Sequence, residues 1–92
     1  MKTELEIYRD EIDAIDKVIA ESFENRMKVV LKVSEYKKAN DINIFDPDRE
    51  KKMIEKNQNY IKDDRLKKYY VELLKKQLEV SKLYQEELKN LK

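Results

Sequence analysis

A cation interrupts the apolar face of a long segment whose spacing is otherwise that of a packed helix. Within residues 5–38, apolar residues recur every three or four positions, and that spacing places Arg26 between Ile19 and Val29. Lys37 follows Arg26 by eleven residues, which is three helical turns, so both side chains project to nearly the same side. Burying an unpaired cation costs several kcal/mol. Arg26 is therefore either in a salt bridge or in contact with an anionic ligand.

Polar side chains also enter the apolar face of the C-terminal segment. Ser81 and Gln85 are four residues apart, so they lie one helical turn from each other on one face. Arg49 and Glu50 begin another expected helix, close to the loop after Lys37. If the helices pack antiparallel, these groups converge on a cavity rich in cations that suits a small dianion with a hydroxyl group. The alternative is a solvated face with polar contacts that specify the packing.

Arg9 provides a geometric argument about assembly. It precedes Arg26 by seventeen residues, or roughly 25 Å along a helix axis. Both side chains cannot hold the same small molecule from one chain. In an antiparallel dimer of first helices, Arg9 of one chain falls near the middle or far end of the other. We therefore expect a dimer with two shared sites.

The first helix is expected to be very long. Residues 5–38 contain no Gly and no Pro, and about 35 residues at ~1.5 Å each give roughly 50 Å. Such a helix extends beyond a compact monomer of this size, which favours dimerisation through it. Thr3 is the expected N-cap. The apolar stripe consists of Leu5, Tyr8, Ile12, Ile15, Ile19, Val29, Val33 and Tyr36.

Two shorter helices are expected after a loop at residues 39–44. Asp46 is the expected N-cap of the second helix, with Pro47 at its first position and an end near Ile61. A break at residues 62–64 precedes the third helix, which runs from Arg65 to about Leu91; one continuous helix is the alternative. The apolar seam of the third helix is Leu66, Tyr70, Leu73 or Leu74, Gln77 or Leu78, Ser81, Gln85 and Leu88.

Composition excludes several classes of protein and site. The chain has 92 residues, 45% charged and 40% hydrophobic, with no Gly and one Pro, which is typical of a single all-α domain over residues 1–92. A net charge of +1 gives no indication of nucleic-acid or membrane-surface binding. Without Cys or His, a thiolate site is excluded and a metal site disfavoured. No apolar run is long enough to span a membrane, and no signal peptide is visible, so we expect a cytoplasmic protein.

The chain resembles the all-α chorismate mutases of the AroQ class over nearly its whole length. The resemblance lies in four motifs: Tyr8-Arg9 through Asp16, Glu24-Asn25-Arg26 followed by Val33 and Lys37, Asp46-Pro47-Asp48-Arg49-Glu50, and Ser81 through Gln85. Each polar interruption described above coincides with a site position of that family. The resemblance implies three helices in an intertwined dimer that converts chorismate to prephenate without a cofactor, metal or covalent intermediate.

The resemblance also implies a role for each site residue. Arg26 and the Arg9 of the partner chain would bind the substrate carboxylates, with Ser81 assisting. Lys37 and Gln85 would donate hydrogen bonds to the ether oxygen, and Glu50 would accept one from the ring hydroxyl. Backbone near Asp46 and the side chain of Arg49 would contribute locally. For Asp46 the first role is that of a helix cap, and for Arg49 the alternative is an ion pair with Glu50 or Asp46.

Two other functions compete with this hypothesis. Isochorismate pyruvate-lyase shares the fold and the cation-lined pocket, but Glu50 favours the mutase. A non-catalytic helical dimerisation module is the rival of another class. It would tolerate apolar residues in place of Arg26, Lys37, Ser81 and Gln85 with no loss beyond stability.

Overall fold

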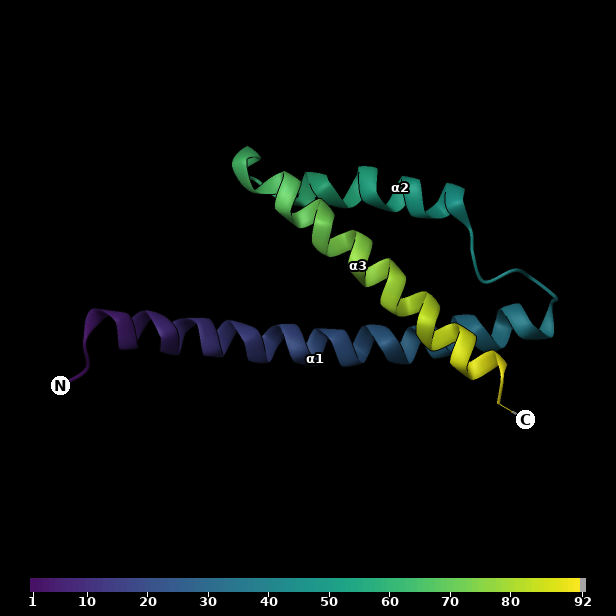
Figure 1. The fold of residues 1–92 in the computed structure, drawn as a ribbon, viewed down its shortest axis with the longest axis horizontal. Coiled ribbons are helices and arrows are strands. Elements are labelled where there is room, and N and C mark those ends of the chain that lie inside the picture. Colours follow the sequence, from purple (N-terminus) through teal and green to yellow (C-terminus); the bar gives the residue numbers. More distant parts are fainter. Residues whose placement is uncertain (92) are drawn as a thin grey trace. The chain divides into compact units, whose positions relative to one another are not determined.

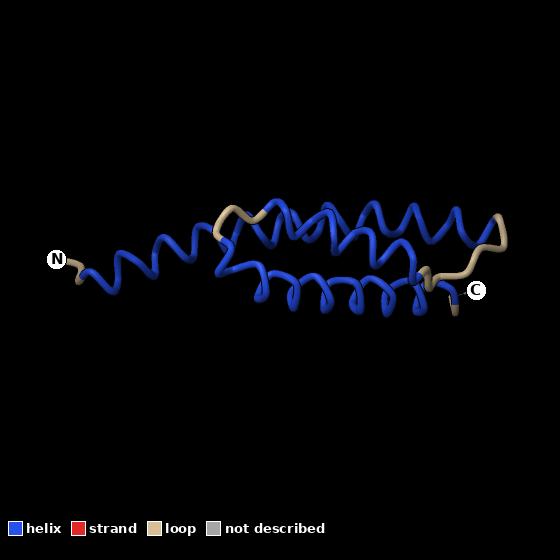
Figure 2. Tube along the Cα trace, turned by 90° about the horizontal axis from the view of Figure 1, so that it is seen from above, coloured by secondary structure: helices blue, strands red, loops and turns tan. Residues whose placement is uncertain are grey.

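The structure is a computed structural model that describes residues 1–91. Its elements are α1 (Glu4–Ala39), α2 (Pro47–Asn57), the short 3₁₀ helix η1 (Gln58–Tyr60) and α3 (Asp64–Lys89). No strand occurs in this part of the chain, which confirms the expected all-α fold (Figure 2). The chain divides into two units, Met1–Val30 and Leu31–Lys92, and each is described by itself below.

From Glu4 onwards, the unit Met1–Val30 is one continuous helix, the N-terminal part of α1. The hydroxyl oxygen of Thr3 accepts a hydrogen bond from the backbone N–H of Glu6 at 3.2 Å. Thr3 therefore caps the N-terminus of α1, as the sequence predicts. The stripe residues of this unit keep 54–60% of their surface exposed: Leu5, Tyr8, Ile12, Ile15 and Ile19. The unit thus presents an amphipathic helix whose apolar face has no cover within the unit.

In the second unit, α1 ends in a Schellman motif built without glycine. Asp41 has a φ of 54°, the left-handed conformation that glycine usually supplies at this position. The N–H of Ile42 donates to the carbonyl of Lys37 at 2.8 Å, and that of Asp41 to the carbonyl of Lys38 at 3.5 Å. The chain has no glycine to use here, and Asp is among the few other residues that tolerate this conformation. The motif turns the chain into the loop that leads to α2.

The start of α2 agrees with the sequence, but its end does not. Asp46 is extended, and its side chain accepts from the N–H of Arg49 at 3.1 Å, with Pro47 as the first helical residue. The α-helix stops at Asn57 instead of continuing to Ile61, because the last turn tightens into η1. Tightening of the final turn is a common way of satisfying the last carbonyls of a helix.

A cap at Asp63 separates the second and third helices. Its carboxylate accepts from the N–H of Arg65 at 3.0 Å, so α3 begins at Asp64, and the alternative of one continuous helix is wrong. The helix ends at Lys89 rather than Leu91. The guanidinium of Arg65 also donates to both oxygens of Asp63. This ion pair holds the pKa of the Asp63 carboxyl below its usual range.

The core of the second unit lies where α2 and η1 pack against α3. Met53 and Leu74 are buried, and Leu74 is almost completely enclosed. Of the alternative seam positions, Leu74 and Leu78 are covered whereas Leu73 and Gln77 are exposed. The covered face continues at spacings of three and four through Ser81, Gln85 and Leu88. The predicted seam is therefore confirmed in its C-terminal part, although Leu66 at its start is exposed.

In the last turns of α1, the residues of the predicted apolar stripe are exposed. Val33 and Tyr36 are exposed, while Leu31, Ser34 and Lys37 are buried or half-buried. Within a single chain, the covered face of these turns is therefore not the face that carries the predicted apolar stripe. Among residues 1–91, no helix is long and apolar enough to cross a membrane.

Candidate functional site

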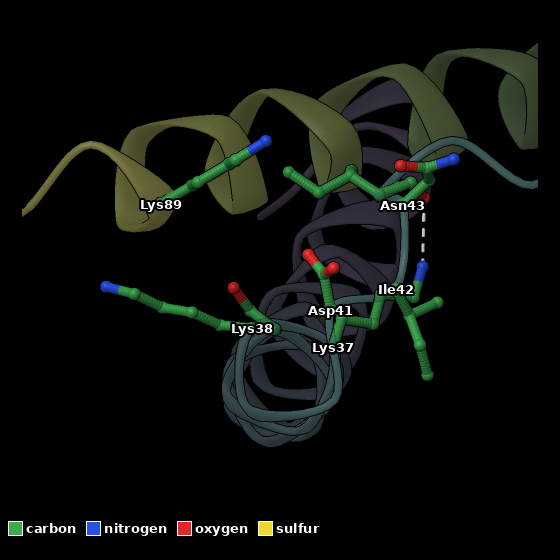
Figure 3. A pocket seen from close by; sticks show the side chains of 8 residues that line it. Lys37, Lys38, Asp41, Ile42, Asn43 and Lys89 are labelled. Carbon is green, nitrogen blue, oxygen red and sulfur yellow. Dashed lines mark hydrogen bonds between the residues drawn. The ribbon is translucent and has the colours of Figure 1, made fainter.

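Lys37 is held by the loop that follows it. Its ammonium donates to the carbonyl of Ile44 at 2.9 Å in a half-buried environment, as the dashed line in Figure 3 shows. Its own carbonyl is the acceptor for Ile42 in the Schellman motif. An ammonium has three donors, and the bond to Ile44 uses one of them. The lysine is thus oriented at both its main chain and its side chain.

A cavity of about 270 Å³ opens beside Lys37. It lies between the last turns of α1, the loop and the end of α3, as Figure 3 shows. Its lining contains three lysines and one carboxylate, so cations predominate in it. Lys37 is the one predicted site residue in this lining, which comprises Ser34, Lys37, Lys38, Asp41, Ile42, Asn43, Ile44 and Lys89.

Three predicted site residues share the first turn of α2. The Asp46 side chain caps the helix, and its carbonyl accepts from the N–H of Glu50 at 3.1 Å. The interpretation of Asp46 as a helix cap is thereby confirmed. Arg49 is exposed and contacts Asp46 through its backbone N–H. Among the described residues, no ion pair joins the Arg49 guanidinium to Asp46 or Glu50, so the alternative of a helix-start ion pair is wrong.

Glu50 is joined instead to a lysine that sequence reasoning did not select. The ammonium of Lys82 on α3 lies 3.1 Å from one carboxylate oxygen of Glu50 and 3.4 Å from the other. The same ammonium lies 4.5 Å from the centre of the Phe45 ring. Nothing in the spacing of Lys82 marks it, because its partner is thirty-two residues away. This contact brings the start of α2 to the part of α3 that carries Ser81 and Gln85.

Ser81 and Gln85 are buried polar side chains on α3, with 6% and 7% of their surfaces exposed. The Ser81 hydroxyl donates to the carbonyl of Gln77 at 2.9 Å. The amide nitrogen of Gln85 donates to the carbonyl of Ser81 at 3.4 Å, a long bond that uses one of its two protons. The amide oxygen of Gln85 is buried without a hydrogen-bond partner. A buried acceptor left unpaired costs about 1–3 kcal/mol, so stability alone does not account for this amide.

Arg9 and Arg26 both lie in the unit Met1–Val30, on the N-terminal part of α1. Arg9 is exposed and Arg26 is half-buried. Whether either residue joins Lys37, Glu50 and Gln85 in one site stays a prediction. In residues 1–91 no cluster of three or more His, Cys, Asp or Glu side chains is arranged to hold a metal ion.

Comparison with protein families identifies the chain's relatives. The family described as chorismate mutase type II matches residues 8–86. The chain belongs to this family. Searches of curated proteins and of solved structures gave no match. The resemblance expected from the sequence motifs is thus confirmed, and the all-α architecture agrees with it.

The match to the chorismate mutase family includes the whole span from Arg9 to Gln85 and therefore all eight predicted site residues. Family membership supports chorismate mutase activity in general, with chorismate as the substrate. The individual role of each residue is a separate question.

Proposed function

We propose that this chain is a chorismate mutase that rearranges chorismate to prephenate, a cytoplasmic step towards phenylalanine and tyrosine. The observation that carries the proposal is the family match over residues 8–86, which contains every predicted site residue. The geometry of the second unit supports it. Lys37 is oriented by its loop, Gln85 is buried with an unpaired oxygen, and Glu50 is held at the start of α2.

The reaction is intramolecular, so the site needs to orient and stabilise rather than to exchange atoms. The C–O bond of the ether breaks as a C–C bond forms within the same molecule, and no proton is transferred. Breaking of the C–O bond runs ahead of C–C bond formation, so negative charge grows on the ether oxygen. Donors already in place there stabilise the transition state more than the ground state. We assign this role to Lys37 and Gln85.

The remaining residues bind and fold the substrate. Arg26 and the partner chain's Arg9 pair with the two carboxylates, and Ser81 donates to one of them. Glu50 accepts from the ring hydroxyl, while Asp46 through its backbone and Arg49 contribute beside it. Holding a flexible substrate in its compact conformer removes entropy that the uncatalysed reaction must lose on the way to its transition state. No cofactor enters this scheme.

We further propose that two chains pair through α1 and share their sites. The support is the exposed apolar stripe of Met1–Val30, which has no cover within its own unit. Burial of apolar surface contributes roughly 25 cal/mol per Å², so a second copy of this helix is the natural cover. Antiparallel pairing would carry Arg9 towards the partner's site.

The decisive experiment is to mix the purified protein with chorismate, follow loss of the diene absorbance, and identify the product. We expect prephenate, with turnover reduced about 10²–10³-fold in Lys37→Met. Lys32→Met is the matched control, because Lys32 is an exposed lysine of the same helix. Absence of prephenate contradicts the proposal. Release of salicylate and pyruvate from isochorismate would instead support the lyase.

A further inference from the structure

Lys82 of α3 forms an ion pair with Glu50 in the first turn of α2. In Figure 1, α2 and α3 meet at the turn near η1 and diverge towards the start of α2 and the end of α3. The ammonium of Lys82 lies 3.1 Å and 3.4 Å from the two carboxylate oxygens of Glu50. The ring of Phe45, in the loop just before α2, lies 4.5 Å from the same ammonium. One cation thus contacts both the loop and the first turn of α2.

The Lys82–Glu50 pair differs from the other ion pairs that α3 makes. Its side chains keep 34% and 22% of their surface exposed, whereas those of the Lys76–Glu79 pair keep 67% and 58%. Exposed pairs within one helix are screened by water and salt and contribute little. A half-buried pair between two elements is screened less. The aromatic face beneath the ammonium adds a cation–π attraction that further restricts its position.

The geometry constrains the carboxylate of Glu50 rather than merely neutralising it. A glutamate at a helix start has three side-chain torsions and no fixed orientation of its own. Contact of one ammonium with both oxygens keeps this edge of the carboxylate directed towards Lys82. A carboxylate has about four acceptor positions, and the single ammonium of Lys82 leaves some of them for another donor.

We propose that Lys82 is a positioning residue that holds the Glu50 carboxylate in the orientation in which it accepts the ring hydroxyl of chorismate. The inference rests on the proposed function and adds a residue to it. Lys82 acts through Glu50 and does not touch the reacting bonds. The competing explanation is that Lys82 only clamps α2 to α3, in which case its loss lowers stability alone.

The test compares Lys82→Met, Lys82→Arg and Glu50→Gln by kcat, KM and the urea midpoint of unfolding. Methionine keeps an apolar stem against Phe45 and removes the charge, whereas arginine restores it. We expect Lys82→Met to lower kcat/KM on the order of tenfold, as a misplaced binding group does, and Lys82→Arg to recover most of the loss. Lys76→Met, which removes the exposed pair with Glu79, is the control and is expected to leave kcat/KM unchanged.

Two further measurements separate positioning from clamping. In the Glu50→Gln background, Lys82→Met should have little additional effect on kcat/KM, because the two residues act as one unit. With a chorismate analogue that lacks the ring hydroxyl, Lys82→Met and the wild type should react equally fast. Independent effects in the double variant, or an undiminished difference on the analogue, overturn the inference while wild-type turnover keeps the proposed function intact. A wild type inactive on chorismate overturns both.

Discussion

The ammonium of Lys37 donates to the carbonyl of Ile44, seven residues further along the chain, at 2.9 Å. The backbone carbonyl of Lys37 meanwhile accepts from Ile42 at 2.8 Å. The loop therefore closes on the same residue twice, through its side chain and its main chain. A cation that has to stabilise developing charge benefits from such an arrangement, because no reorganisation is needed as the reaction proceeds.

The first prediction concerns Asp41, whose left-handed backbone makes this closure possible. A β-branched residue fits that conformation poorly, so Asp41→Val should lower the free energy of unfolding by about 1–2 kcal/mol. It should also lower kcat, because the two contacts of Lys37 with the loop are disturbed. Asp41→Gly should keep wild-type stability and turnover, since glycine is the usual residue there. Urea unfolding followed by circular dichroism, together with chorismate turnover, measures both effects. A fully stable Asp41→Val variant would argue against the observed backbone.

The second prediction separates activity from stability at Gln85. Gln85→Leu removes a buried oxygen that has no partner and a long bond to Ser81. Stability should therefore stay the same or rise slightly, because the unpaired acceptor disappears. Turnover should nevertheless fall about 10²–10³-fold with the loss of a donor to the ether oxygen. The matched control is Gln77→Leu, the same chemical change at an exposed position of α3. Wild-type turnover in Gln85→Leu would remove the amide from the proposed mechanism.

The third prediction tests whether two chains share their sites. Arg9→Ala and Lys37→Ala variants should each be nearly inactive as separate proteins. After unfolding and refolding together, mixed dimers should regain one intact site, with the Lys37 of one chain and the Arg9 of the other. Up to about a quarter of wild-type turnover is expected if chains pair at random, since half the dimers are mixed and each has one site. No recovery despite demonstrated exchange of chains would count against the shared site.

The fourth prediction concerns pH and the cap of α3. The Arg65 guanidinium holds the pKa of the Asp63 carboxyl below its usual range. Because the folded-state pKa is the lower one, the ionised cap stabilises the fold above the usual range of an aspartate. This contribution disappears as the pH falls through the folded-state pKa. The difference in unfolding free energy between wild type and Asp63→Asn should therefore shrink between about pH 7 and pH 3.

A partner variant identifies the cause of that pH dependence. In an Arg65→Gln background, the Asp63→Asn substitution should show a much smaller change with pH, because the guanidinium is the main cause of the lowered pKa. Urea titrations at several pH values supply the free energies. An equally large pH dependence without Arg65 would assign the effect to the helix terminus instead.

Local signals explain most of what could be predicted about the helices. Thr3, Asp46 and Asp63 each cap a helix through a backbone N–H two or three residues away, so their effect is contained in a short stretch of sequence. The end of α2 could not be predicted in the same way. The tightening of its last turn into η1 accompanies packing of that turn against α3, which no local pattern records.

In the candidate site, too, some features could be predicted from the sequence and others depend on tertiary packing. Residue types and spacing selected seven positions and the family resemblance added Asp46, and the family match from residue 8 to residue 86 includes all eight. The contacts of those residues were not predictable. The role of Phe45 and Lys82 around Glu50, and the bond from Lys37 to Ile44, depend on how a loop and two helices meet in space.

The sequence by itself therefore determined an all-α chain with capped helices, a long first helix and the polar positions that interrupt its apolar faces. These features depend on helical periodicity and on interactions between neighbours in the chain. Tertiary structure alone decided that Leu74 rather than Leu73 faces the core, and that Glu50 pairs with Lys82 thirty-two residues away. Both depend on the rotation and crossing of packed helices, which the spacing of residues within a single helix does not specify.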